Sequence, residues 1–326
     1  MPQEDESRTG SGKRKQKEST NEDSQDLDQI TAGNSGRSLD KSDNSVGSNS
    51  DSSKPLELDP LSPRSLLALR NLARYGQWKS RNDGSGHGWS EWPDNRRAAV
   101  MVALFGGKSG ELNVLVSTRA MDLRAHPGEV ALPGGKVEPR DVDLEHTARR
   151  EAFEEIGLPI SRESVRHLCN LPPFLSRSAP LLVTPVICFL LDATLKPNLN
   201  PAEVTNVFSH PLYSFLKDTP PSPHYVPDAV INGTKPYRLH YDIEWLHGRP
   251  YRLFRFEGRL NAVRGFTADI LVRTAMIAYL QAPDFERKAP GQMKRTELIR
   301  TALEDLQKAS LSAKASDARK DTKSKL

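Results

Sequence analysis

The stretch from residue 134 to residue 158 reads GGKVEPRDVDLEHTARREAFEEIGL, and its second half carries the pattern R-E-x-x-E-E-x-G. In an α-helix, Glu151, Glu154 and Glu155 stand at positions i, i+3 and i+4, so their three carboxylates share one face within a single turn. Like charges at this spacing destabilise a helix by roughly 0.2–0.5 kcal/mol per pair. The stretch therefore predicts a helix whose acidic face needs a positive partner.

The simplest alternative for such a cluster is a solvated acidic helix face that binds nothing. The surrounding glycines favour a binding site instead. Gly134 and Gly135 lack a Cβ, so the backbone ahead of the helix can approach a ligand or a metal closely. Gly157 follows the last carboxylate and can take the left-handed conformation that ends a helix. A hard divalent cation that prefers oxygen ligands, Mg²⁺ or Mn²⁺, meets the charge requirement.

The whole arrangement resembles the Nudix box, whose pattern is G-x5-E-x7-R-E-U-x-E-E-x-G-U with U an aliphatic residue. Counting from Gly135 places Asp141 at the first glutamate of this pattern, and the arginine comes one residue late, at Arg150. Ala152 occupies a position where a larger aliphatic residue is common. A box that is one residue longer, with Asp at this place, resembles the coenzyme A diphosphatase branch of the family.

A second signature lies just upstream, where residues 115–135 read LVSTRAMDLRAHPGEVALPGG. This segment is similar to the branch pattern L-L-T/S-x-R-S/A-x3-R-x3-G-x-V-x-F-P-G-G, with Leu132 in place of the usual Phe. Two arginines of the pattern, Arg119 and Arg124, can each bind phosphate oxygens through two hydrogen bonds, which lysines do less well. The positions in register are Ser117, Arg119, Ala120, Arg124, Gly128, Val130, Pro133, Gly134 and Gly135.

Two later segments extend the resemblance to about residues 96–280. Residues 200–212 are similar to the segment N-P-x-E-V-x3-F-x-x-P-L of the branch and include Glu203. Residues 264–271 are similar to its element W-G-L-T-A-x-I-L, although Arg264 replaces the tryptophan. This replacement bears on the local packing and not on the chemistry.

The resemblance implies the α/β/α Nudix fold, in which a mixed β-sheet is sandwiched between α-helices. It also implies metal-dependent cleavage of coenzyme A (CoA) or an acyl-CoA to adenosine 3′,5′-bisphosphate and (acyl-)4′-phosphopantetheine. On this interpretation Arg150 orients Glu154, and the general base stays open between Glu151 and Glu203. The expected catalytic residues are Glu151, Glu154 and Arg150, the expected ligands of Mg²⁺ or Mn²⁺ are Glu151, Glu154 and Glu155, and the expected substrate-binding residues are Arg119, Arg124, Gly134 and Gly135.

Composition divides the chain into three segments. Residues 1–55 contain twelve serines and no aromatic residue, so we expect residues 1–56 to form a disordered tail that is neither a signal peptide nor a transit peptide. Residues 57–300 form the expected Nudix domain, and residues 301–326 form an expected basic tail. Residues 306–326 carry a net charge of +4, equal to the formal charge of the whole chain. The basic composition therefore gives no indication of a nucleic-acid-binding face.

Within the expected domain, helix-like runs alternate with strand-like runs. We expect a loop or short helix at residues 206–217, and a last helix at residues 267–280 that is capped by Thr267. Leucine spacing predicts a helix at 66–75 with Pro63 near its start, and apolar or alternating runs predict strands at 98–105, 112–118 and 184–191, with strand pairs at 237–256 around a turn at 247–250.

Cysteine content and the final residues bear on the cellular location. The two cysteines, Cys169 and Cys188, indicate neither a disulfide framework nor a zinc site. No apolar run approaches the roughly 20 residues that a membrane span needs. Ser324, Lys325 and Leu326 form the S-K-L tripeptide that the peroxisomal import receptor reads. We therefore expect a peroxisomal enzyme with this receptor as a partner.

Three other functions stay open. One is a Nudix hydrolase of NADH or ADP-ribose, although residues 159–180 lack the S-Q-P-W-P-F-P-like motif of the peroxisomal NADH branch. Another is a Nudix-like module that binds without catalysis, although such a module has no need to keep a repulsive carboxylate cluster. An RNA-cap hydrolase, the third, would need a larger basic face than this core offers.

Overall fold

The structure is a computed structural model that describes residues 61–82, 91–192 and 194–323. All of these residues belong to the compact unit that spans Asp43–Leu326. The expected N-terminal tail, residues 1–56, and the tripeptide at 324–326 lie outside the described residues. None of the described helices is long and apolar enough to cross a membrane.

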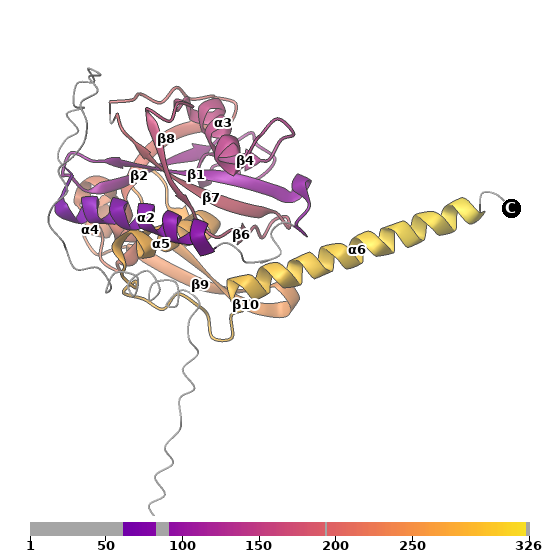
Figure 1. Cartoon of the computed structure of the whole chain (residues 1–326). Helices are drawn as coiled ribbons and strands as arrows, with labels where there is room; N and C mark the ends of the chain where they lie inside the picture. Colours follow the sequence, from indigo (N-terminus) through magenta and orange to yellow (C-terminus); the bar gives the residue numbers. More distant parts are fainter. Residues whose placement is uncertain (1–60, 83–90, 193, 324–326) are drawn as a thin grey trace, which may run out of the picture. The chain divides into compact units, whose positions relative to one another are not determined.

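An eight-stranded mixed sheet forms the centre of the described fold (Figure 1). Its main path runs in the order β3-β2-β1-β7-β5, while β4, β6 and β8 pair with β1, β7 and β2 respectively. Strands β1 and β7 are parallel, and the other pairings are antiparallel. The strands are β1 (Arg97–Gly106), β2 (Leu112–Arg119), β3 (Val130–Ala131), β4 (Gly134–Lys136), β5 (Val165–Asn170), β6 (Phe174–Leu175), β7 (Leu182–Leu190) and β8 (Val204–Pro211).

The apolar runs that predict strands lie in the middle of this sheet. The runs 98–105 and 112–118 form the antiparallel hairpin β1–β2, in which Leu104 lies opposite Val114. The third run falls on β7, where every residue is buried. A strand that is covered on both faces needs apolar side chains throughout, which explains its unbroken apolar sequence. These strand predictions are confirmed.

Helices cover both faces of the sheet (Figure 1). Alternate residues of β1, among them Ala99 and Met101, share a core cluster with Ala148 and Ala152 of α3. On the other face, α2 packs against α5 and against β5. The expected α/β/α arrangement is present, and the predicted helix at 66–75 lies within α2. The helices are α2 (Pro63–Asn82), α3 (Leu144–Ile156), α4 (Asp228–Ile231), α5 (Gly265–Tyr279) and α6 (Arg295–Lys323), with 3-10 turns at Asp94–Arg96, Leu212–Leu216, Pro223–Tyr225 and Leu246–Gly248.

A second, three-stranded sheet follows in the order β11-β10-β9. It contains β9 (Arg238–Trp245), β10 (Arg249–Phe256) and β11 (Val263–Arg264). The 3-10 turn at Leu246–Gly248 joins β9 to β10, and His247 in this turn has a φ of 55°. The predicted strand pair around residues 247–250 is therefore confirmed.

The prediction of a loop or short helix at residues 206–217 is wrong for the first half of that segment. Strand β8 runs along β2 up to Pro211, and only Leu212–Leu216 forms a 3-10 helix. Thr205 and Asn206 are exposed because β8 has no second neighbour in this sheet. An edge strand with polar, solvent-facing residues lacks the apolar run that marks a buried strand.

The end of the chain differs in two respects from the expectation. The N-cap of α5 is Arg264, and Thr267 lies inside the helix, where its hydroxyl donates to the carbonyl of Val130 at 3.0 Å. A further helix, α6, begins at Arg295, so the tail expected from residue 301 starts inside this helix. Its first turns join a buried cluster of Leu298, Ile299, Ala302 and Leu303 with Trp92 and Leu182. The lysine-rich composition beyond these turns obscured their helical spacing.

Candidate active site

Helix α3 is fixed at both ends by the residues that surround it. At the start, the side chain of Asp143 accepts a hydrogen bond from the His146 N–H at 2.7 Å, as N-cap residues do. At the end, Gly157 has a φ of 70° and forms the left-handed C-cap, which confirms the predicted helix stop. A Cβ on Gly157 would stand 2.8 Å from the Cβ of Asn198, so this glycine also makes room for the following loop.

Small residues on the buried face of α3 bring the helix close to the sheet. Ala148 and Ala152 are fully buried against β1 residues Ala99 and Met101. The alanine at 152, where a larger aliphatic residue is common, therefore lies at a close contact between helix and sheet. This contact places the carboxylates of the next turn beside β4.

Gly134 and Gly135 leave room for the carboxylates of α3. The N–H of Gly134 donates to Oε2 of Glu155 at 3.3 Å. A Cβ on Gly135 would collide with the carboxylate of Glu151, and a Cβ on Gly134 would collide with the carbonyl of Ala99 in β1. The close approach that the glycines predict is thus made by side chains of α3 and by β1 itself. A substrate contact at Gly134 or Gly135 stays a prediction.

Arg150 is the centre of a buried hydrogen-bond network. Its guanidinium makes two bonds to Asp141, at 3.0 and 2.9 Å, and one each to the carbonyl of Lys136, to Glu151 and to Glu154. The side chain of Asp141 is completely buried, and Arg150 holds the pKa of this carboxyl well below its usual range. All these bonds are internal and hold the carboxylates in place, while a part for Arg150 in catalysis stays a prediction.

Glu154 differs from its neighbours in the cluster because its side chain is 42% exposed. One oxygen accepts from Arg140 at 3.0 Å and the other accepts from Arg150 at 3.1 Å. The (i, i+4) pair with Arg150 that the sequence predicts is present. Both oxygens of Glu154 are therefore already paired with arginines, while its role as a metal ligand stays a prediction.

Glu151 and Glu155 are the carboxylates of the cluster whose negative charge is least compensated by neighbouring groups. Burial, together with the charges of Glu151 and Glu203, raises the pKa of Glu155 to about 8, and Arg119 opposes this shift. Burial also raises the pKa of Glu151, against the effect of its bond to Arg150. Negative charge at this place thus exceeds the positive charge that the protein supplies. A bound cation would correct that imbalance.

The backbone brings the three sequence motifs together around Glu155. The N–H of Asn200 donates to the carbonyl of Glu155 at 2.9 Å, and the N–H of Ala120 donates to the carbonyl of Glu203 at 2.8 Å. The Nε of Arg119 donates to the carbonyl of Ala125 at 3.3 Å, which orders the loop after β2. The sequence motifs at 119–135, 150–157 and 200–203 therefore meet at one place.

Arg124 lies on this loop with its side chain exposed. Within the part of the chain that the structure describes, no acidic side chain forms an ion pair with it. Its guanidinium is thus available to an anionic ligand. Binding of substrate by Arg119 and Arg124 stays a prediction.

Glu129, at the end of the same loop, has a role that its sequence pattern does not indicate. Its carboxylate pairs with His126 at 2.9 Å and with Arg264 at 3.2 Å, which ties the loop to β11. Arg264 replaces the tryptophan of the branch pattern, so this chain fixes the loop with an ion pair at that position. Only the packing of β11 beside β3 reveals the contact.

A second arginine network lies on α3, and the sequence pattern does not indicate it either. Arg149 is buried and donates to Glu145 at 2.8 Å, to the carbonyl of Ile160 at 3.1 Å and to that of Val165 at 2.7 Å. Counting from Gly135 places the arginine of the Nudix box at this residue, but Arg149 points toward β5. Arg150 contacts the carboxylates instead.

The donor set at Glu151 and Glu155 suits a hard divalent cation, because it consists of carboxylate oxygens with excess negative charge. Among the described residues, no three His, Cys, Asp or Glu side chains are already gathered into a metal-binding group. Glu154 is paired with Arg140 and Arg150, and these arginines hold its carboxylate. The expected triad thus consists of two carboxylates that repel each other, Glu151 and Glu155, and a third, Glu154, that is held by arginines.

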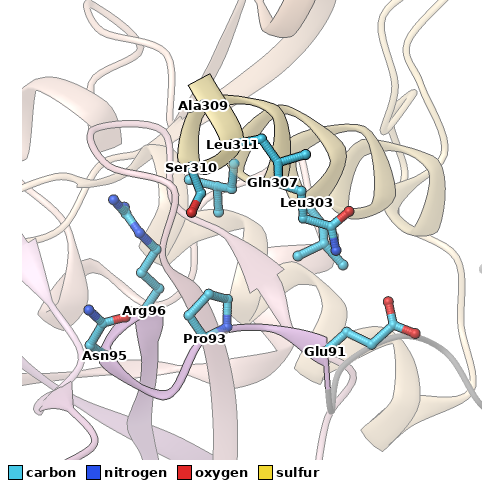
Figure 2. A pocket seen from close by; sticks show the side chains of 10 residues that line it. Glu91, Pro93, Asn95, Arg96, Leu303, Gln307, Ala309, Ser310 and Leu311 are labelled. Atoms are coloured by element: carbon cyan, nitrogen blue, oxygen red, sulfur yellow. The ribbon is translucent and has the colours of Figure 1, made fainter. Parts of the chain in front are cut away.

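A hollow in the surface lies elsewhere, between α6 and the residues that precede β1. Figure 2 shows Pro93 and Arg96 on one side of this groove and Leu303 and Gln307 of α6 on the other. None of its lining residues belongs to the three sequence motifs. The groove is therefore distinct from the carboxylate site.

Comparison with known proteins identifies the family of the domain that carries these residues. The family model described as the NUDIX domain matches residues 95–228. The chain is 40% identical over 200 residues to "Nudix hydrolase 15, mitochondrial" of Arabidopsis thaliana, covering 60% of this chain and 63% of that protein. It is 35% identical over 210 residues to "Peroxisomal coenzyme A diphosphatase 1, peroxisomal" of Saccharomyces cerevisiae, covering 56% and 58%. The chain thus spans less than two thirds of the length of both relatives.

A third relative is matched over most of its length. The chain is 32% identical over 223 residues to "Peroxisomal coenzyme A diphosphatase NUDT7" of Mus musculus, covering 66% of this chain and 84% of that protein. The domain match includes β4, α3 and the residues that meet around Glu155. The chain belongs to the Nudix hydrolase family.

Proposed function

We propose that this protein hydrolyses the diphosphate of CoA or of a CoA derivative. Water adds to one phosphorus, the bridging P–O bond breaks, and the products are adenosine 3′,5′-bisphosphate and (acyl-)4′-phosphopantetheine. The observation that carries the proposal is the meeting of Arg119, Glu203 and the Glu151–Glu155 pair at one place. Two relatives whose names contain "coenzyme A diphosphatase" support the choice of substrate.

Each part of the site has a task in this reaction. Mg²⁺ or Mn²⁺ held by Glu151 and Glu155 would neutralise the diphosphate oxygens and lower the pKa of a bound water. Arg119 and the exposed Arg124 bind further phosphate oxygens and orient the diphosphate. Arg150 and Asp141 keep Glu151 in place through the hydrogen bonds described above.

Glu203 is the better candidate for the general base. Oε1 of Glu151 already accepts from Arg150 at 2.8 Å, and this carboxylate is one of the proposed metal ligands. The carboxylate of Glu203 accepts no hydrogen bond from any residue that the structure describes, and it is only partly buried. A free carboxylate beside the two ligands can accept the proton of the attacking water.

The decisive experiment is a product assay by mass spectrometry with Mg²⁺ or Mn²⁺ and four substrates: CoA, an acyl-CoA, NADH and ADP-ribose. We expect adenosine 3′,5′-bisphosphate from CoA or the acyl-CoA. Arg124→Ala should raise the KM for CoA, whereas Arg177→Ala, another exposed arginine outside the three motifs, should leave it unchanged. Turnover of NADH or ADP-ribose with CoA untouched would refute the substrate and leave the fold assignment intact.

We also propose that the enzyme works in peroxisomes. Two relatives carry "peroxisomal" in their names, although another is named as mitochondrial. The sequence motif that supports this location is Ser324-Lys325-Leu326. In cells that express the chain with a fluorescent protein at its N-terminus, removal of Leu326 should move the signal from peroxisomes to the cytosol. Cytosolic signal from both forms would contradict the proposal.

A further inference from the structure

The outer edge of the three-stranded sheet is formed by β9. Among the strands that the structure describes, β9 pairs with β10 alone. Leu239 and Tyr241 on this strand are large apolar side chains, and each of them is 43% exposed. An edge strand presents a row of backbone N–H and C=O groups that can pair with another strand.

The ladder to β10 determines which groups of β9 face outward. The N–H of Glu257 donates to the carbonyl of Tyr237 at 2.8 Å, so this pair continues the hydrogen-bonded register of β9 and β10. Hydrogen-bonded pairs alternate along an antiparallel ladder, and odd-numbered residues of β9 therefore bond to β10. The even-numbered residues 238, 240, 242 and 244 direct their N–H and C=O groups to the free edge.

The side chains of β9 complement a second copy of β9. When two copies run antiparallel about a two-fold axis at Tyr241, Arg238, which also pairs with Asp218, lies opposite Glu244 of the second copy. His240 then lies opposite Asp242, which also pairs with Arg252. These are the residues whose backbone groups face outward, so both pairs are hydrogen-bonded. On the other face, Leu239 lies opposite Ile243 and Tyr241 lies opposite itself, which covers the exposed apolar side chains.

Charged residues on an edge strand usually prevent pairing with other chains. In β9, the order of the charged residues favours one pairing register over the registers that are shifted by one or two residues. A shift by two residues in one direction places Asp242 opposite Asp242 and keeps two His240–Glu244 pairs. A shift in the other direction places His240 opposite His240 and keeps two Arg238–Asp242 pairs, whereas the register about Tyr241 has four pairs of unlike residues and no like pair among these even-numbered positions. A shift by one residue would place residues whose backbone groups bond to β10 opposite residues whose backbone groups face the free edge, so the two strands could not form a regular ladder. The sequence of β9 is therefore selective for self-pairing about Tyr241.

We propose that β9 pairs with β9 of a second copy of this chain, which joins the two three-stranded sheets into one six-stranded sheet. The first test is the oligomeric state of the native protein. Light scattering of the full chain should give a molar mass twice the 36.3 kDa of one chain. Glu244→Lys, which opposes a positive charge to Arg238, should shift the mass toward one chain. Glu163→Lys makes the same charge change at another exposed residue and should leave the dimer intact.

Cysteine cross-linking tests the register. In a non-hydrogen-bonded pair the two Cα atoms lie about 4.5 Å apart, which a disulfide can span. Tyr241→Cys should therefore form a disulfide-linked dimer on mild oxidation. Leu239 is as exposed as Tyr241, so Leu239→Cys is the matched control. In the proposed register, residue 239 of one copy lies four residues along the strand from residue 239 of the other, a distance of about 13 Å. This control should stay largely monomeric on a non-reducing gel. Both native cysteines are buried, so neither interferes.

Several results would overturn the proposal. A wild-type mass of one chain at every concentration excludes the dimer. Equal cross-linking of the two cysteine variants, or none in either, excludes this register. An unchanged far-UV circular dichroism spectrum of the Glu244→Lys variant shows that a loss of dimer does not come from misfolding. A dimer that survives this substitution places the interface elsewhere.

Discussion

On the side of α3 that faces β5, Glu145 accepts hydrogen bonds from Arg149 and from Arg162. On the side that faces β4, Glu155 accepts one backbone N–H and lies within the fields of Glu151 and Glu203. Burial is similar for the two carboxylates, at 8% exposed for Glu145 and 7% for Glu155. Their surroundings move their pKa values in opposite directions, down for Glu145 and to about 8 for Glu155.

The two sides of α3 differ in whether the fold itself compensates the charge of a buried carboxylate. Glu145 is paired by two arginines, so its negative charge is compensated within the fold. Glu155 has no arginine at hydrogen-bond distance, and only the N–H of Gly134 and the more distant charge of Arg119 oppose the effect of its burial. A charge cluster that costs free energy in the unliganded protein points to a ligand that compensates it. We therefore expect substitutions on the two sides to affect different properties.

The largest effect should come from Glu155→Gln measured as a rate. If Glu155 holds a divalent ion that stabilises charge in the transition state, its loss should lower kcat by roughly 10²–10³ or more. The measurement is steady-state hydrolysis of the preferred diphosphate at saturating Mg²⁺ or Mn²⁺. Full activity of this variant would show that the metal site lies elsewhere.

The same substitution should stabilise the metal-free protein at high pH. Below pH 4.5 the Glu155 carboxyl is protonated in the folded and unfolded chain, and above pH 8 it is ionised in both. Between these values only the unfolded chain ionises, so the free energy of unfolding of the wild type falls as the pH rises through this window. In EDTA, Glu155→Gln should therefore gain on the order of 5 kcal/mol over the wild type at pH 9 and little at pH 5.

Thermal or urea unfolding at the two pH values checks this prediction. The informative quantity is the difference between variant and wild type, because other groups titrate in both proteins. An equal difference at pH 5 and pH 9 would show that ionisation of Glu155 is not costly in the fold. A gain at pH 9 that disappears on addition of Mg²⁺ or Mn²⁺ would link the penalty to the proposed ligand.

Arg149→Met, on the other side of α3, should lower the free energy of unfolding. It removes the donors of two buried carbonyls and one of the two partners of Glu145, at a cost of about 2–3 kcal/mol. The matched control is Arg162→Met, whose side chain is 73% exposed and whose loss should lower the free energy of unfolding far less. Urea unfolding measures both. Equal costs for the two variants would contradict the buried role of Arg149.

The contrast between Arg149 and Arg150 also shows how far the sequence could predict the site. The order R-E-x-x-E-E-x-G selects Arg150 because the spacing to Glu151, Glu154 and Glu155 is counted within one helix. Counting from Gly135 crosses a loop and selects Arg149, and only the structure shows that the longer loop lets Asp141 reach Arg150. Helical spacing is a reliable guide to neighbours, whereas spacing across a loop is not.

The same distinction holds for the rest of the fold. Buried strands such as β7 are predictable because their burial demands continuous apolar sequence. Strand β8 was missed because it lies at an edge, and α6 was missed because its apolar face is confined to its first turns. The pair between Glu129 and Arg264 joins residues far apart in the sequence. Nothing in the local pattern of either residue indicates the other.

The smallest effect that we expect is that of Glu154→Gln. Glu154 is one residue from Glu155, but it is 42% exposed, and its oxygens are paired with Arg140 and Arg150 rather than directed at Gly134. Replacing it removes a charge that acts mainly through Arg150, which keeps its bonds to Asp141 and Glu151. The expected loss in kcat is less than about ten-fold, or less than roughly 1.4 kcal/mol. Assay beside Glu155→Gln, under the same metal concentrations, decides whether the two carboxylates are equivalent. If Glu154→Gln loses as much activity as Glu155→Gln, Glu154 must leave its arginine partners and join the metal when the substrate binds.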